Sequence, residues 1–266
     1  GVIRGENLGS NKSIGLRADM DALPIQENTN LPYASKITGK MHACGHDGHT
    51  TMLLGASKYL AEKRNFKGTA IMIFQPAEEG LGGAVKMIED GLFEKFPCDE
   101  IYGIHNTPNG KFGKVGICKG IAMAGAAFFD IIIKGKGSHA AMPHQSKDPI
   151  VIASNLISQL QNIVSRNLPP LESVVLSVTQ IHSGSAYNII PENCIINGTI
   201  RYFSEESYGI VENRFKKICQ GFELANGISI ELKIRKVFDV LVNDFELSDS
   251  YMDAAEKIVG SAFITR

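Results

Sequence analysis

The chain has 266 residues, of which 44% are hydrophobic and 21% charged, and its formal net charge is −1. This near-neutral balance argues against a strongly electrostatic partner, so we expect neither nucleic acid nor a membrane surface as a ligand. No apolar run approaches the roughly 18–20 residues of a membrane span. The five cysteines lack framework spacing, which is typical of reduced thiols in a cytoplasmic protein.

The first half of the chain contains three β-rich runs, each followed by polar residues. The second run is almost entirely apolar, as expected of a strand that is covered on both faces of a parallel sheet. Because sites form at the carboxyl ends of such strands, we expect the polar residues to converge at one edge. The runs are residues 13–17, 68–74 and 100–104, and the residues after them are Asp19 and Asp21, Glu78 and Glu79, and His105.

A stretch rich in metal-binding side chains, Met41–Thr50, lies between the first two runs and contains three histidines, one cysteine and one aspartate. Cys44 and His46 are separated only by a glycine, so a turn can direct both at one point. We expect Asp47 to be the N-cap of a helix that follows and ends near Glu62. Any one of these residues could belong to an ordinary turn, but the cluster as a whole predicts a site for a zinc-like metal.

Glu78 and Glu79 are adjacent at a predicted strand end and can therefore point in different directions. One carboxylate can bind a metal while the other takes a proton from the water that the metal activates, as a hydrolase requires. The alternative is an exposed acidic loop, which is common after strands.

The second half of the chain has a different pattern of elements. Its predicted order is β-α-β-β-α-β, which is the ferredoxin-like arrangement. We therefore expect a compact α+β domain, residues 118–235, inserted into an α/β domain made of residues 1–117 and 236–266. The predicted elements are residues 126–134, 148–167, 173–181, 194–203, 205–225 and 228–237, with a further helix at 248–259.

Six motifs occur in an order that resembles one known family. The resemblance is to the amidohydrolase branch of the aminoacylase/carboxypeptidase-G-like zinc metallopeptidases, which includes hippurate hydrolase and N-acyl-amino-acid amidohydrolases. It implies a catalytic domain with a mostly parallel sheet and an inserted lid domain that forms a homodimer. The motifs are Arg17–Pro24, Met41–His49, Phe74–Gly80, Gly103–His105, Gly137–His144 and Asn188–Glu192.

The resemblance also implies a chemistry. Two divalent metal ions per subunit, zinc in first place and manganese, cobalt or nickel as alternatives, would serve the hydrolysis of an N-acyl amino acid. The implied metal ligands are Cys44, His46, Glu79 and His105, with Cys44 bridging the ions. Glu78 matches the general base.

Further roles follow from the same resemblance. Asp21 matches a carboxylate that orients the metal site, and His139 a lid histidine that stabilises the oxyanion in the partner subunit. Asn188 and Arg201 match the pair that holds the substrate carboxylate. The family pattern also leads us to expect more sequence at both ends, including one more histidine ligand, since His182 is the last histidine here.

Several alternatives stay open at this point. An N-acetyl-diaminopimelate deacetylase or a dipeptidase would use the same chemistry. A metal-binding or dimerising homologue without catalysis, or a domain stabilised by structural zinc, would not need a general base. Intact Glu78 and His139 favour the enzyme, since neither is needed for a merely structural site.

Overall fold

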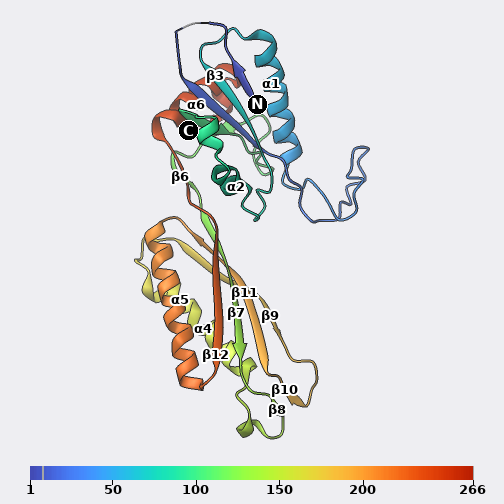
Figure 1. The fold of residues 1–266 in the computed structure, drawn as a ribbon, viewed down its shortest axis with the longest axis vertical. Helices are drawn as coiled ribbons and strands as arrows, with labels where there is room; N and C mark the ends of the chain where they lie inside the picture. Colours follow the sequence, from blue (N-terminus) through green and yellow to red (C-terminus); the bar gives the residue numbers. More distant parts are fainter. Residues whose placement is uncertain (8, 266) are drawn as a thin grey trace. The chain divides into compact units, whose positions relative to one another are not determined.

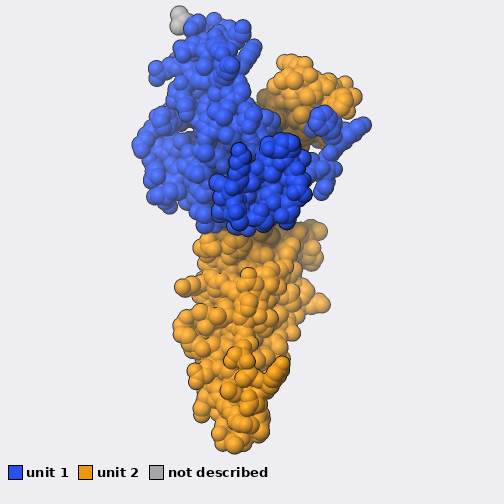
Figure 2. All heavy atoms as spheres, turned by 90° about the vertical axis from the view of Figure 1, so that its right-hand side faces the viewer, with its two compact units in different colours: residues 1–114 blue, residues 115–266 orange. Residues whose placement is uncertain are grey.

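The computed structural model describes residues 1–7 and 9–265. The chain divides into two compact units, Gly1–Lys114 and Val115–Arg266, which are coloured separately in Figure 2. Within the described residues, no helix has the length and apolar character needed to cross a membrane.

The first unit is built on a four-stranded sheet in the order β1-β3-β2-β4. The three strands expected from the sequence are present and run parallel, which confirms the predicted mostly parallel sheet. A short antiparallel edge strand, β1 (Val2–Arg4), was not predicted. The other elements of this unit are β2 (Ser13–Asp19), β3 (Thr69–Gln75), β4 (Glu100–Gly103), α1 (His46–Lys63), α2 (Gly83–Glu89) and α3 (Leu92–Lys95).

The apolar run in β3 explains where the core of this unit lies. Four consecutive residues, Ala70–Ile73, are buried, so both faces of the strand are covered, as its continuous hydrophobicity predicted. Leu53 of α1 packs into the same cluster as Ala18 and Met72. Packing of α1 against the sheet holds the amino end of that helix beside the carboxyl end of β2 (Figure 1).

The second unit contains the predicted ferredoxin-like fold. Its four-stranded sheet has the order β12-β7-β11-β9 and every pair is antiparallel. Helices α4 and α5 lie on one face of this sheet (Figure 1). We call this part the lid fold; its elements are β7 (Gly125–Lys134), α4 (Pro149–Asn167), β9 (Val174–Ser183), β11 (Asn193–Tyr202), α5 (Glu205–Asn226) and β12 (Ser229–Phe238).

Alternation along β7 shows why this sheet has a single covered face. Phe129, Ile131 and Ile133 are fully buried under the helices, whereas Asp130 and Lys134 between and beyond them are exposed. This period of two is the pattern of a sheet with one face on a core.

Shorter elements complete the second unit. Helix α6 lies next to β5 and β14, and β13 pairs with β6. The assignment of residues 236–266 to the catalytic domain stays a prediction. These elements are β5 (Val115–Gly116), β6 (Gly120–Met123), β8 (Ser138–His139), η1 (Pro143–Gln145), β10 (Ile189–Ile190), β13 (Leu241–Asn243), α6 (Phe245–Val259), η2 (Ser261–Phe263) and β14 (Ile264–Thr265).

Candidate metal centre

The turn between Cys44 and His46 is made by Gly45, which has a left-handed backbone with φ of 84° and is the N-cap of α1. Glycine adopts this conformation without the steric cost of a Cβ atom. His46 is therefore the first residue of the helix, and Asp47 lies inside the first turn. The expectation that Asp47 caps the helix is wrong, because the chain has already entered the helix one residue earlier; its charge still complements the helix dipole.

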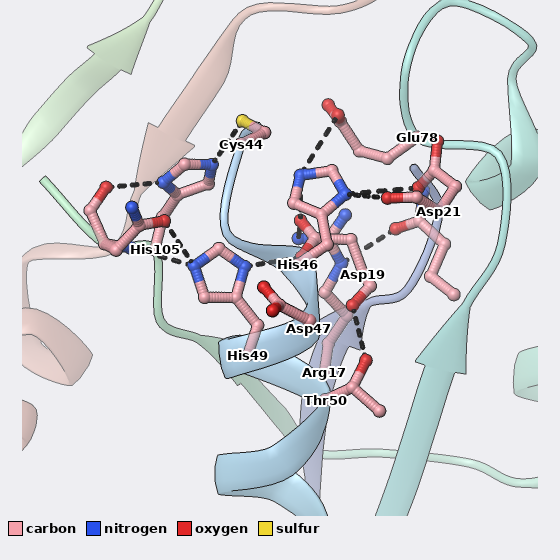
Figure 3. A network of polar contacts seen from close by, with 12 residues as sticks. Arg17, Asp19, Asp21, Cys44, His46, Asp47, His49, Thr50, Glu78 and His105 are labelled. Carbon is pink, nitrogen blue, oxygen red and sulfur yellow. Dashed lines mark hydrogen bonds and ion pairs between the residues drawn. The ribbon is translucent and has the colours of Figure 1, made fainter. Parts of the chain in front are cut away.

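The ring of His46 lies at the centre of a cluster of carboxylates (Figure 3). Its Nδ1 is 3.0 Å from the backbone oxygen of Asp21; a carbonyl only accepts, so Nδ1 carries the proton and Nε2 presents a lone pair. Nε2 is buried and has no hydrogen-bond partner among the described residues. Around it lie carboxylate oxygens of Asp19 at 3.7 Å, Glu79 at 3.9 Å and Glu78 at 4.0 Å.

His105 and Cys44 meet on the other side of the cluster. The Nδ1 of His105 is 2.7 Å from the backbone oxygen of Asn106, so this ring also turns an unprotonated Nε2 outward. That Nε2 is 3.5 Å from the Cys44 sulfur. Burial and the nearby carboxylates of Glu79 and Glu78 raise the pKa of the Cys44 thiol to about 11.

These donors fit a divalent metal ion. The ligand atoms of Cys44, His46 and Glu79 all lie within 4.8 Å of one another. A buried lone pair without a partner is costly, and here it faces several negative charges and a thiol whose raised pKa makes ionisation unfavourable without a nearby cation. Thiolate, imidazole and carboxylate are the donors that zinc binds, so a cation would satisfy all three at once.

The loop that carries Glu78 and Glu79 is held in a defined conformation. Asp21 Oδ2 accepts a 3.0 Å hydrogen bond from the backbone N–H of Glu79. Ala77, just before the pair, has a positive φ of 52°, a strained conformation for a residue with a side chain. Burial and the adjacent Glu79 carboxylate raise the pKa of Glu78. The two neighbouring acids therefore occupy different environments.

Sequence reasoning missed a hydrogen-bonded group beside this centre. The Nδ1 of His49 is 2.6 Å from Asp19 Oδ1, and its Nε2 is 2.9 Å from the backbone nitrogen of Asn106. Arg17 donates to the other Asp19 oxygen at 2.8 Å. Burial raises the pKa of Asp19, but the His49 hydrogen bond and the Arg17 charge outweigh it, so the net shift is downward. The sequence contains one indication that His49 belongs near the centre: it follows His46 by three residues and so shares its helix face.

The predicted residues of the second unit fall into two places. His139 on β8 pairs with Ile189 on β10. The backbone oxygen of Asn188 accepts a 3.0 Å hydrogen bond from the backbone nitrogen of Ala140, so His139 and Asn188 are neighbours. Arg201 lies near the other end of β11, stacked over the ring of Phe128. The nine residues from Asn193 at the start of β11 to Arg201 span about 26 Å. The lid fold of a single chain therefore does not bring Arg201 and Asn188 together.

The model of peptidase family M20/M25/M40 matches residues 15–266. The chain belongs to this family. Hippurate hydrolase from Campylobacter jejuni is 49% identical to this M20 chain over 260 residues, which is 98% of the chain and 67% of that relative. N-acetyl-L-cysteine deacetylase from Bacillus subtilis is 46% identical over 256 residues, covering 96% of the chain and 61% of the relative. The M20 chain thus spans about two thirds of the length of these relatives.

Solved structures agree with this assignment. The crystal structure of a dinuclear metal-binding peptidase of the M20 family from Bacillus subtilis has a TM-score of 0.77 and 36% identity, covering 97% of this chain and 65% of that one. The fold class expected from the sequence is confirmed.

Proposed function

We propose that this M20 chain carries the active site for metal-dependent hydrolysis of the amide bond of N-acyl amino acids, with hippurate-like compounds as the first substrates to test. The observation that carries the proposal is the unpartnered Nε2 of His46 facing a thiol and carboxylates. The proposed ligands of two divalent ions are Cys44, His46, Glu79 and His105, and zinc is the first candidate because of the sulfur and nitrogen donors.

Glu78 has the properties of a general base in this reaction. Its carboxylate lies beside the ligand cluster, 4.0 Å from His46 Nε2, without being needed in the ligand set. Bound ions would supply Lewis acidity that polarises the substrate carbonyl and acidifies water. Glu78 takes a proton from the attacking water, whose oxygen bonds to the carbonyl carbon. It then returns the proton to the amide nitrogen as the C–N bond breaks, which yields a carboxylate and a free amino acid.

The lid residues complete the proposal. His139 would donate a hydrogen bond to the oxyanion that develops in the transition state. Asn188 lies beside His139, so the two would act together on one substrate, whereas Arg201 is too far along β11 to join them within one chain. We therefore propose a homodimer in which His139 and Asn188 of one lid and Arg201 of the other hold the substrate, with Arg201 binding its carboxylate through its guanidinium group.

The test is release of glycine from hippurate by the purified chain with added zinc, with chelator, and with substitution of Glu78. Glu78→Gln keeps the size of the side chain but removes the base, so turnover should fall by about 10²–10⁴-fold while metal content is unchanged. Glu94→Gln, an exposed acid on α3, is the matched control and should retain activity. Equal turnover of Glu78→Gln and wild type would show that Glu78 is not the base.

A second candidate is deacetylation of N-acetyl amino acids, because the match to N-acetyl-L-cysteine deacetylase is nearly as close as that to hippurate hydrolase. Both reactions break the same bond and differ only in the acyl group. The glycine-release experiment should therefore be run in parallel with N-acetyl-cysteine and N-acetyl-diaminopimelate. The ratio of kcat/KM values decides between the two acyl groups.

A further inference from the structure

Three hydrogen-bonded side chains lie beside the proposed ligands without belonging to them. Asp19 ends β2, His49 is in the first turn of α1, and Asn106 follows β4. We call these three residues the His49 clamp. Asp19 and His49 are 1% and 2% exposed, so the hydrogen bond between these two side chains is shielded from water and keeps its full strength.

The hydrogen bonds of His49 leave it no free lone pair for a metal. Its Nδ1 must donate to Asp19 Oδ1, at 2.6 Å, because an ionised carboxylate only accepts. On its other side, Nε2 faces both the backbone nitrogen of Asn106 at 2.9 Å and the side-chain amide of the same residue at 2.7 Å. Whichever way that amide is turned, Asn106 engages Nε2. His49 therefore differs from His46 and His105, whose Nε2 atoms face the donor cluster.

Asn106 connects this histidine to the turn that presents two ligands. A Cβ atom placed on Gly45 would lie only 2.7 Å from Asn106 Oδ1, so the amide packs directly against the turn between Cys44 and His46. The backbone oxygen of Asn106 also accepts the hydrogen bond that orients His105. Asn106 thus contacts both the turn that carries Cys44 and His46 and the ring of His105.

We infer that the His49 clamp is a positioning device of the metal centre: it locks the Cys44–His46 turn against the His105 loop so that their donor atoms face one another before an ion binds. This inference rests on the metal site of the proposed function. Its consequence is that affinity for metal depends on His49 and Asn106 although neither is a ligand. Outer groups that orient ligands contribute about 10–100-fold to metal affinity.

The test is the affinity of the full chain for zinc, measured by competition with a chromophoric chelator. His49→Asn keeps a donor near the Nδ1 position and loses the link to Asn106, and Asn106→Ala removes the side chain that packs on the turn. Each should weaken binding about 10–100-fold. Because both break one connection, the double variant should be little weaker than either single variant. His42→Asn, an exposed histidine of the same loop, is the matched control and should bind as wild type.

Cobalt(II) gives a readout that a merely structural role would not change. In wild type saturated with cobalt, the sulfur-to-metal charge-transfer absorption reports the Cys44 bond. It should be weaker or shifted in both clamp variants, even where circular dichroism shows that they are folded. Wild-type affinity and spectra in the folded variants would overturn the inference and leave the proposed metal site intact.

Two other outcomes are decisive. If wild type binds neither zinc nor cobalt, the metal site of the proposed function is wrong and the inference falls with it. If His49→Asn does not fold, Asn106→Ala decides alone, because Asn106 is exposed and its side chain is not part of the core. A wild-type spectrum in that variant would then overturn the inference.

Discussion

Adding one methyl group at Gly45 should destabilise the first unit and misplace two proposed ligands. Gly45→Ala puts a side chain on a residue with φ of 84°, where its Cβ would lie 2.7 Å from Asn106 Oδ1. The left-handed conformation costs about 1–2 kcal/mol for a residue other than glycine. Moving Asn106 aside weakens its contacts with His49, each worth about 1 kcal/mol. Together we expect a loss of roughly 2–4 kcal/mol.

Gly55→Ala is the matched control, because it makes the same chemical change inside the helix that Gly45 caps. A Cβ atom at Gly55 would meet nothing within 4 Å, and Gly→Ala inside a helix stabilises by about 0.5–1 kcal/mol. The two units need not unfold together, so the assay is pulsed hydrogen exchange along a urea series, read on peptides from α1. The reasoning is refuted if Gly45→Ala unfolds at the same urea concentration as Gly55→Ala.

Two further predictions concern the lid fold and the thiol of the centre. Asp148 caps α4 by accepting hydrogen bonds from the backbone nitrogens of Ile150 and Val151 at 2.9 and 3.3 Å, so Asp148→Ala should cost about 1 kcal/mol. Urea-dependent exchange of α4 peptides measures this, and an unchanged midpoint contradicts the cap. Because the Cys44 pKa is raised to about 11, its alkylation by iodoacetamide in metal-free protein should quicken about tenfold per pH unit from pH 8 to 10. Mass spectrometry of that peptide follows the rate, and a plateau near pH 8 would mean that the thiol ionises normally.

The secondary structure could be predicted from the sequence because it depends on local pattern. The apolar run of β3 and the alternation along β7 each indicate a strand and which faces of it are covered. Asp148 followed by Pro149 marks the start of α4, since an acid at the N-cap and a proline after it satisfy helix geometry locally. Asp47 shows the limit of this reasoning: an equally good cap residue is passed over because Gly45 starts the helix first.

Composition and spacing alone could not separate the roles of the three histidines in Met41–Thr50, and only the family resemblance singled out His46. The same imidazole occurs at each position, and its chemistry depends on which groups its two nitrogens meet. His46 donates from Nδ1 to a backbone oxygen and keeps a buried lone pair at Nε2, whereas His49 uses both nitrogens between Asp19 and Asn106. Those partners come from residues 25 to 57 positions away in the chain. The sequence by itself determined which donor types are present; the packing of β2, α1 and the segment after β4 decided which of them can face a metal.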